Sequence, residues 1–426
     1  MYLRLHILIL LLLSSLTAQT MVSGNVNGLW DLQGSPYQLE DNTVVAVGDT
    51  LIITANTLVD LGGSFELRIR GTLIASNAQF FNGGELFGES GFLSLNACRF
   101  TGLNAGISVF GGQAAFENCI IDSTNETGIT FSGTDTSYVR HSQVLTSGDY
   151  GIKITGTDVV EVVGNTLRGN STHDFNHPAL FIDSCSPQVI EQNIIEENHA
   201  QGIGVWTLTA TAYPTIRNNI VRRNFTGITL VNSPAFIEGN IIVANYQERN
   251  ADSGAGIYAG YPSSTGIVMN NYIAGNYYGV SNISSAHLNL GDMINDYPGD
   301  DGLNIFYDNT YNRQTWNIWN STSDELLAQN NYWPGLTMAE VDATIWDNEE
   351  GGAEVIIEPV YVEALPVPPD VNADTHVNIL DIVLVIENIL IIGVPEPVAF
   401  FLSDVNRDYS VNVQDVVTLI ERVLEG

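Results

Sequence analysis

The stretch Asn193-Ile194-Ile195-Glu196-Glu197-Asn198 places two asparagines five residues apart around an apolar doublet. The same spacing recurs at Asn165 and Asn170, Asn219 and Asn224, Asn240 and Asn245, and Asn271 and Asn276. A glycine followed by an aliphatic residue recurs at Gly106-Ile107, Gly128-Ile129, Gly151-Ile152, Gly202-Ile203, Gly227-Ile228, Gly256-Ile257 and Gly279-Val280. Most intervals in this second series are 22 to 29 residues, so the middle of the chain is a repeat.

A repeat of this length indicates a solenoid in which each repeat forms one coil. The apolar segments are short and rich in β-branched residues, which favours strands, and no sustained 3.6-residue periodicity supports helices. Coils of strands stack about 4.8 Å apart, which brings equivalent side chains into register. We therefore expect the asparagines to occupy corners, where asparagine tolerates left-handed backbone, and to form ladders of amide hydrogen bonds.

These motifs resemble those of the right-handed parallel β-helix repeat proteins, the superfamily that includes pectate lyases and polygalacturonases. The resemblance covers about residues 45–360 and implies an all-β right-handed parallel β-helix, which we assign to residues 19–360. Residues 50–53 and 71–75 have the pattern of early strands. Residues 330–357 resemble a closing coil, in which a short helix covers the open end of the array.

Residues 1–18 have the features of a signal peptide, with a basic start at Arg4, an apolar run over residues 7–13 and small residues before Gln19. We therefore expect an extracellular protein, either secreted or attached to the cell surface. No later segment reaches ~18 consecutive apolar residues, so the sequence predicts no membrane span.

Acidic residues dominate the charge, because 48 Asp and Glu against 14 Lys and Arg give a formal net charge of −34. This balance excludes a general affinity for nucleic acid or anionic membranes, which both require a basic surface. It also weighs against a polyanionic substrate, unless a local arginine cluster overrides the global field. Three corner arginines are expected to pair with nearby glutamates: Arg217, Arg222 and Arg223 with Glu191, Glu196 and Glu197.

Three cysteines, Cys98, Cys119 and Cys185, are too few for a disulfide scaffold. Cys98 and Cys119 lie 21 residues apart, which is about one coil. Stacking at the coil spacing would bring them within the Cα range of a disulfide. Two stacked, buried thiols are the alternative, and the sequence leaves this redox state open.

Two nearly identical acidic loops lie near the end of the chain, at residues 370–381 and 404–415. They share seven of twelve positions, and side-chain oxygens recur at positions 1, 3, 5, 9 and 12. This spacing lets a short loop surround a hard cation with oxygen ligands, as in EF-hand calcium loops. Apolar residues at the same offsets after each loop predict two amphipathic helices. The sequence therefore predicts two loop–helix repeats with Ca²⁺ as their cofactor.

Residues 370–426 resemble a type I dockerin, a family of two calcium-loop-and-helix repeats that binds cohesin modules. A Pro-rich linker at residues 361–369 precedes them, and we expect it to act as a semi-rigid spacer that separates the loops from the β-helix. The resemblance implies the calcium ligands Asp370, Asn372, Asp374, His376, Asp381, Asp404, Asn406, Asp408, Ser410 and Asp415. His376 and Ser410 would contribute backbone carbonyls.

Two features depart from the dockerin pattern. Thr375 and Tyr409 occupy the turn position where glycine is usual, which we expect to weaken calcium affinity. Ile379-Leu380 and Val413-Gln414 occupy positions that often carry small hydroxyl residues for cohesin contact. The sequence thus predicts a protein partner for the tail and leaves open whether it is a cohesin.

In β-helix enzymes the resemblance implies a site on the outer face, among loops that project from successive coils. Residues 171–178 and 246–253 form two long insertions of this kind. Their candidate catalytic residues are Asp174, Glu248, Arg249 and Asp252. Carboxylates would serve hydrolysis, which needs an acid and a base or nucleophile about 5 to 9.5 Å apart, whereas the arginine would be the base of a lyase. Solvated loop residues are the alternative interpretation.

Two functions are open at this point. One is a secreted protein whose β-helix binds or degrades an extracellular polysaccharide, as a glycoside hydrolase or a polysaccharide lyase, with the dockerin-like tail attaching it. The other is a non-catalytic adhesive or structural protein of the cell surface or matrix. Sugar rings stack on exposed aromatic side chains, whereas other aromatic residues serve packing. Aromatic residues recur on the middle coils, at Trp206, Tyr213, Tyr258, Tyr261, Tyr277 and Tyr278.

Overall fold

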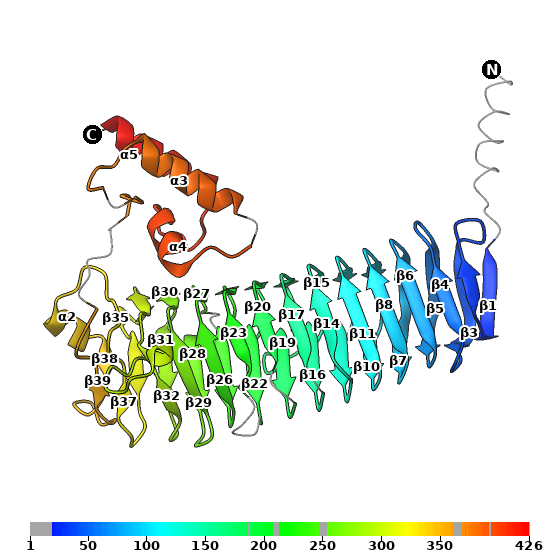
Figure 1. Cartoon of the computed structure of the whole chain (residues 1–426), viewed down its shortest axis with the longest axis horizontal. Helices are drawn as coiled ribbons and strands as arrows, with labels where there is room; N and C mark the ends of the chain where they lie inside the picture. Colours follow the sequence, from blue (N-terminus) through cyan, green and yellow to red (C-terminus); the bar gives the residue numbers. More distant parts are fainter. Residues whose placement is uncertain are drawn as a thin grey trace.

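The computed structural model describes residues 19–425 apart from residues 158, 186–187, 208–212, 247–253, 362–367, 373 and 392. The predicted signal peptide, residues 1–18, lies outside the described residues. The described residues form a long parallel β-helix and a small helical domain beside its C-terminal end (Figure 1). The parallel β-helix expected from the repeat is therefore confirmed.

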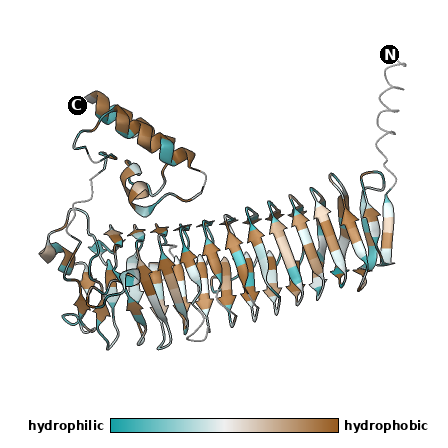
Figure 2. Ribbon diagram, viewed as in Figure 1, coloured by the Kyte–Doolittle hydropathy of each residue, from teal (hydrophilic) through white to brown (hydrophobic). Residues whose placement is uncertain are grey.

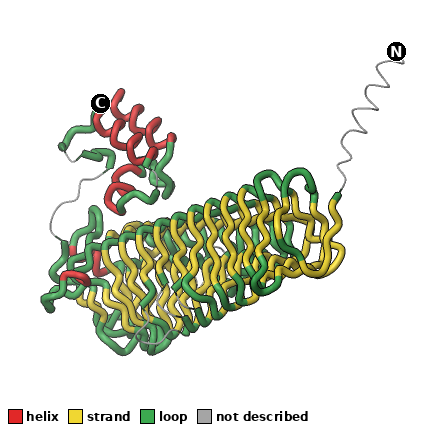
Figure 3. The backbone as a smooth tube through the Cα atoms, turned by 45° about the vertical axis from the view of Figure 1, so that its right-hand side comes forward, coloured by secondary structure: helices red, strands yellow, loops and turns green. Residues whose placement is uncertain are grey.

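Strands of successive coils stack into three parallel faces (Figure 3). The face that we call the glycine face follows the Gly-aliphatic pairs. It consists of β10 (Gly106–Phe110), β13 (Ile129–Ser132), β16 (Ile152–Thr155), β19 (Leu180–Asp183), β22 (Ile203–Trp206), β25 (Ile228–Val231), β28 (Ala255–Gly260), β31 (Tyr278–Asn282), β36 (Ile318–Asn320) and β38 (Ile345–Trp346).

The asparagine face lies between the paired asparagines. It consists of β9 (Arg99–Thr101), β12 (Ile120–Asp122), β15 (Gln143–Leu145), β18 (Thr166–Arg168), β21 (Ile194–Glu196), β24 (Ile220–Arg222), β27 (Ile241–Val243), β30 (Tyr272–Ala274) and β33 (Ile305–Tyr307). In the first coils long strands span both of these faces: β1 (Thr20–Asn25), β3 (Tyr37–Val45), β5 (Leu58–Ile69) and β7 (Gln79–Glu89).

The third face is a 14-stranded parallel sheet. Its strands are β2 (Gly28–Trp30), β4 (Thr50–Ile53), β6 (Thr72–Ser76), β8 (Phe92–Asn96), β11 (Gln113–Glu117), β14 (Ser137–Arg140), β17 (Val160–Val163), β20 (Val189–Glu191), β23 (Thr215–Arg217), β26 (Pro234–Glu238), β29 (Thr265–Met269), β32 (His287–Asn289), β37 (Leu326–Leu327) and β39 (Val355–Ile356). Inward residues of all three faces form one continuous apolar core, and hydrophobic residues recur along the strands in Figure 2.

Buried asparagine ladders run along both ends of the asparagine face, as predicted. The Asn219 side-chain amide donates to Asn240 Oδ1 at 2.9 Å and to the Ile190 carbonyl at 3.0 Å. Asn219 Oδ1 accepts from the Asn193 backbone at 2.9 Å. The two ladders contain Asn165, Asn193, Asn219, Asn240, Asn271 and Asn304, and Asn170, Asn198, Asn224, Asn245, Asn276 and Asn309.

The left-handed residues of these corners lie one position earlier than expected. Asn218, with φ of 53°, precedes the ladder residue Asn219, and Gln192, with φ of 56°, precedes Asn193. The turn must be complete before the ladder residue, because the backbone N–H of Asn219 already donates to Asn240 Oδ1 of the next coil.

Cys98 and Cys119 occupy the same column of coils as one asparagine ladder. The Cys119 backbone donates to Ser142 Oγ at 2.9 Å, and the Ser142 backbone donates to Asn165 Oδ1 at 2.8 Å. Both cysteines are free and buried, and the Cys119 thiol donates to the Leu95 carbonyl at 3.3 Å. The structure therefore corresponds to the two-thiol alternative.

Short elements close the C-terminal end of the β-helix. They are the 3₁₀ turn η1 (Pro298–Asp300), the antiparallel hairpin of β34 (Thr310–Tyr311) and β35 (Gln314–Thr315), and helix α2 (Met338–Asp342). The α2 helix begins at a capping box of Thr337 and Glu340 and lies in the predicted closing segment. None of the described helices is both long and apolar enough to cross a membrane.

The small helical domain, here called the tail, contains α3 (Ile379–Leu390), α4 (Pro397–Ser403) and α5 (Val413–Glu425). Two of these helices follow the acidic loops, as predicted. Val385, Val405 and Leu419 form a small core of its own. The tail lies against the asparagine face, with α4 over β27 and β30 (Figure 1). The linker was expected to separate the loops from the β-helix. The tail instead packs against the β-helix.

Candidate functional sites

The glycine face exposes a row of aromatic and small residues. Strand register aligns Phe181, Gly204, Thr229, Tyr258, Ser281 and Trp319 across six successive coils. Trp206 lies in the neighbouring row, opposite Asp183 on one side and Val231 on the other. Small residues between large rings leave depressions in the surface, because every coil contributes one side chain to each row.

Two adjoining depressions form a groove on this face. The larger has a volume of about 420 Å³ and is lined by Gln201, Trp206, Phe225, Thr226, Thr229, Val231, Tyr258 and Tyr261. The smaller has a volume of about 240 Å³ and is lined by Tyr258, Tyr278, Ser281, Ile283, Trp319 and Ser321. Tyr258 borders both, and none of these lining residues carries a charge. Within the described residues, the lining of the groove is thus aromatic and uncharged.

Three polar atoms in the larger depression have no hydrogen-bond partner among the described residues. They are Gln201 Oε1, Trp206 Nε1 and Thr229 Oγ1, each buried from solvent. Thr229 is only 6% exposed. A buried polar atom without a partner is unfavourable, so these positions suit a ligand that supplies hydroxyl groups.

A cluster of titratable residues lies beside the groove. Asp149 Oδ1 is 3.3 Å from His177 Nδ1 and 3.6 Å from His173 Nδ1. The Tyr150 ring stacks on His177 at 4.4 Å between centroids. Burial and the charge of Asp149 raise the pKa of Tyr150. Phe181 lies 5.0 Å from Tyr150, so this cluster, which we call the Asp149 cluster, continues into the aromatic row.

The structure describes only one of the four predicted catalytic residues. Asp174 belongs to the edge of the Asp149 cluster, because its Oδ2 lies 3.9 Å from His177 Nε2. Glu248, Arg249 and Asp252 lie outside the described residues, so their relation to Asp174 stays a prediction. Within the described parts of the chain, the two acidic loops of the tail included, no three His, Cys, Asp or Glu side chains are placed to hold a metal ion in this structure.

The corner arginines follow the predicted pairing in two of three cases. Arg217 contacts Glu191 at 2.9 Å, and Arg222 contacts Glu196 at 2.7 Å. Glu197 instead pairs with Arg168, and Arg223 donates to the tail.

The two acidic loops of the tail fold in the same way around their first and last carboxylates. Asp370 accepts from the backbone N–H groups of residues 374 and 375, and Asp404 accepts from those of residues 408 and 409. Asp381 and Asp415, at position 12, each accept from backbone N–H groups at both ends of their loop. Both loops therefore have the closed form that the twelve-residue calcium pattern requires.

The chemistry of the second loop fits a cation. Asp404 and Asp415 are fully buried, and Asp408 Oδ1 has no hydrogen-bond partner among the described residues. Burial, together with the charges of Asp415 and Asp408, raises the pKa of Asp404 to about 7. Buried carboxylates crowd together favourably only when a proton or a cation compensates their charge. The loops thus supply the oxygen ligands that calcium prefers.

In both loops the residue at the usual glycine position has a strained backbone conformation, as the sequence predicts. Thr375 has φ of 70° and Tyr409 has φ of 64°, which is the left-handed conformation that glycine adopts most easily.

Comparison with known families agrees with this architecture. The family described as "Right handed beta helix region" matches residues 22–167, 85–242 and 170–314, which together span more than half of the chain. The chain therefore belongs to the right-handed β-helix family. The "Dockerin type I domain" family matches residues 368–424. The protein is thus a right-handed β-helix protein with a C-terminal type I dockerin domain.

Two solved structures are similar to this chain at low identity. A mutant of the periplasmic alginate epimerase AlgG is 14% identical, with 80% of this chain and 82% of that chain covered and a TM-score of 0.45. The A-module of the mannuronan C-5 epimerase AlgE6 from Azotobacter vinelandii is 13% identical, with 68% and 86% covered and a TM-score of 0.20. No curated protein matches the sequence.

Several groove and cluster residues were missed by sequence reasoning, namely Asp149, Tyr150, Phe225, Thr229 and Trp319. A signal for the groove row does exist. Four of its six members directly follow the aliphatic residue of a Gly-aliphatic pair, as Thr229 follows Gly227-Ile228. Aligning the repeats on these pairs shows which residues share one outward row, since strand side chains alternate between inside and outside.

Proposed function

We propose that this is an extracellular protein that binds a neutral polysaccharide in the groove of its glycine face and is attached to a protein partner by its calcium-loaded dockerin domain. The groove carries this proposal. Its aromatic walls, uncharged lining and three unpartnered polar atoms together match the surface of a sugar chain.

Stacking and hydrogen bonding would share the recognition of the sugar. The faces of sugar rings are apolar and stack on Trp206 and Tyr258, while hydroxyl groups provide partners for Gln201 Oε1 and Thr229 Oγ1. The distance from Trp206 on β22 to Trp319 on β36 spans four coil steps, which is about 19 Å. This length accommodates several sugar units in one row. A neutral glycan also avoids repulsion by the net charge of −34.

The dockerin domain supplies the attachment. Calcium would be held by the ligand set Asp370, Asn372, Asp374, His376, Asp381, Asp404, Asn406, Asp408, Ser410 and Asp415. The left-handed Thr375 and Tyr409 lower the affinity toward the range of extracellular calcium modules. Exposed apolar residues on α3 and α5 provide a surface for a cohesin-type module; the most exposed are Ile379, Leu380, Leu390, Val413 and Leu424.

The groove is tested by calorimetric titration with soluble neutral oligosaccharides, such as glucans, xylans and mannans, and with acidic ones. We expect Trp206→Ala to reduce affinity for the preferred neutral glycan at least tenfold. Phe110→Ala is the matched control, because Phe110 lies in the same outward row, four coils away from Trp206. Equal losses in both variants, or binding of acidic glycans alone, would refute the proposal.

Catalysis at the Asp149 cluster is the second candidate function. An imidazole oriented by a carboxylate is a general base, and His177 is held in this way by Asp149. The cluster lies at the end of the aromatic row, where a bound glycan would pass. Mass spectrometry of a bound glycan after incubation tests this role. His177→Asn should abolish product formation while leaving binding intact, whereas His199→Asn should change neither.

A further inference from the structure

The outward residues of the asparagine face change character along the β-helix. The early coils place polar side chains outward, as at Arg99, Gln143 and Thr166. From β21 onward most outward residues are apolar, namely Ile194, Ile220, Ile241, Val243, Tyr272, Ala274 and Ile305, and they lie beside Glu196, Arg222 and Tyr307. An apolar strip of this kind on the outside of a β-helix is unfavourable in water, so we expect another element or a partner to bury it.

Helix α4 of the tail covers this strip. Phe400, Phe401 and Leu402 are buried together with the outward residues of β24, β27, β30 and β33. The Phe401 ring lies 5.6 Å from the Tyr272 ring, and Tyr272 is fully buried by this contact. The tail therefore contributes side chains to a second apolar core, separate from the core inside the β-helix.

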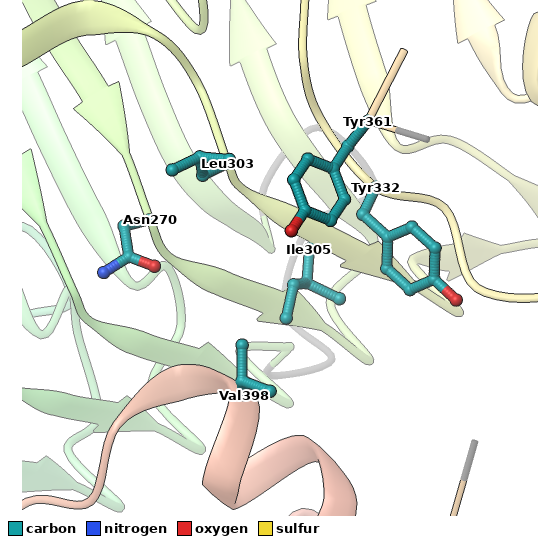
Figure 4. Close-up of a pocket in the computed structure, with 6 residues that line it drawn as sticks. All are labelled: Asn270, Leu303, Ile305, Tyr332, Tyr361 and Val398. Atoms are coloured by element: carbon teal, nitrogen blue, oxygen red, sulfur yellow. The ribbon is translucent and has the colours of Figure 1, made fainter. Parts of the chain in front are cut away.

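The margin of this contact contains a small cavity of about 130 Å³. Val398 of α4 faces Ile305 of β33 across it, and Leu303, Tyr332 and Tyr361 form the remaining apolar walls (Figure 4). Its small volume shows that α4 packs closely on the β-helix.

Polar contacts from the second acidic loop surround the apolar contact. Arg222 and Arg223 each donate to Ser410 Oγ at 3.0 Å, and Arg223 also donates to the Asp408 carbonyl at 3.2 Å. The Tyr409 hydroxyl donates to Asp308 Oδ2 at 3.3 Å. The Arg407 guanidinium lies over the Tyr307 ring at 4.7 Å. The second loop thus contacts the coils of β24 and β33 on the asparagine face.

These contacts coincide with three of the five positions at which the two loops differ. Ala373, Thr375 and His376 of the first loop correspond to Arg407, Tyr409 and Ser410 of the second. All three second-loop residues contact the β-helix. By contrast, Thr375 and His376 are exposed, and the His376 side chain is 79% accessible.

We propose that the second dockerin repeat is a docking element for the β-helix of the same chain. The first repeat keeps an exposed loop, so an external partner meets the tail in one fixed orientation relative to the glycan groove. The groove stays open, because the tail covers the asparagine face and the groove lies on the glycine face.

Docking is coupled to calcium, a statement that rests on the proposed calcium site. The arginine contacts involve the carbonyls of Asp408 and Tyr409 and the hydroxyl of Ser410, which all belong to the second loop. A cation that orders this loop also orders the docking surface. By linkage, docking raises the calcium affinity of the second loop by the same factor.

Hydrogen–deuterium exchange of the full chain in calcium tests the docking. The variant with Arg407→Ala, Tyr409→Thr and Ser410→His gives the second loop the residues of the first at these positions. We expect faster exchange at residues 220–225, 272–276 and 305–309, with unchanged exchange at residues 165–170. The reverse variant, with Ala373→Arg, Thr375→Tyr and His376→Ser, should leave all these segments unchanged.

A substitution in the β-helix, with the tail left unchanged, distinguishes loss of docking from unfolding of the tail. Arg223 lies half-buried at a corner of the β-helix, where its guanidinium contacts the tail. Arg223→Ala should therefore release the tail without unfolding either domain, and Arg168→Ala is its control on the same face. Continued protection of α3 and α5 in calcium would show that the tail stays folded. Equal exchange of residues 272–276 in the wild type and both docking variants would overturn the proposal, whatever the glycan measurements show.

Discussion

Tyr409 of the tail lies directly against Gly275 of the β-helix. A Cβ built on Gly275 would lie 2.3 Å from the Tyr409 ring Cζ, a distance that no packed side chain tolerates. The equivalent corner positions of neighbouring coils carry Ala244 and Asp308, both with positive φ. The corner therefore accepts a side chain in other coils. At position 275 it is the Tyr409 ring of the tail that leaves no room for one.

The first prediction concerns this contact. Gly275→Ala should displace Tyr409 and speed hydrogen exchange at residues 272–276, because the new methyl group occupies the space of the ring. Gly169→Ala is the matched control, since Gly169 occupies an equivalent corner with φ of 68° and has only Thr146 at 3.9 Å near its Cβ. Similar exchange in both variants would argue against a packed Tyr409.

The second prediction separates binding from stability in the groove. Thr229→Val removes a buried hydroxyl that has no partner among the described residues, so thermal stability should stay equal or rise slightly. Glycan affinity should fall about tenfold, because the ligand loses a hydrogen bond of about 1.4 kcal/mol. Thr130→Val, in the same outward row, should change neither quantity. Unchanged glycan affinity of Thr229→Val would contradict a direct contact.

The third prediction concerns the asparagine ladder. Asn219→Ala should lower the free energy of unfolding by about 3 kcal/mol, because a buried backbone N–H of Asn193 and the Ile190 carbonyl lose their partner. Denaturant unfolding followed by circular dichroism measures the loss. Gln143→Ala, outward and exposed on the same face, should cost less than about 0.5 kcal/mol. A loss of similar size in both would mean that the ladder contributes little.

The fourth prediction concerns calcium removal. A chelator should abolish the helical circular dichroism signal of the tail while the β signal persists, because the buried carboxylates of the loops then lack a compensating cation. Asp415→Asn should have the same effect at low calcium, and Asp296→Asn, on an exposed loop of the β-helix, should not. A tail that is equally helical with and without calcium would contradict the proposed site.

The fifth prediction concerns the glycine position of the first loop. Thr375→Gly removes a left-handed backbone cost of about 1 kcal/mol, which should raise calcium affinity up to about fivefold. Tyr409→Gly relieves the same cost in the second loop but also removes the docking contact, so its net gain should be smaller. Calorimetric calcium titration of the full chain compares the two variants. Equal gains would indicate that docking adds nothing to the second site.

Much of the architecture was predictable because it depends on short, repeated patterns. Asparagines five residues apart and Gly-aliphatic pairs fix where each coil turns and which side chains enter the core, so the β-helix and its ladders follow from the sequence. The two acidic loops and the helices after them were equally accessible, since each loop lies within twelve consecutive residues. The left-handed corner residues were misplaced by one position, because the ladder asparagine needs its own N–H for the next coil.

The groove and the Asp149 cluster were only partly predictable. Asp174 was found from its insertion, but Asp149 comes from the preceding coil and meets Asp174 only through His177. The groove depends on which outward residues share a row, and that requires the register of strands more than twenty residues apart. The aromatic residues Trp206 and Tyr258 were found, whereas Thr229 and its unpartnered hydroxyl were not.

The sequence by itself determined the coils and the two acidic loops with the helices after them, because each depends on local spacing and on the periodicity of apolar residues. Only the tertiary structure decided where the tail lies. Arg223 and Ser410 are almost two hundred residues apart, and no local pattern joins them. Their contact exists because the asparagine face becomes apolar beneath α4, and burying that strip places the second loop beside the corner arginines.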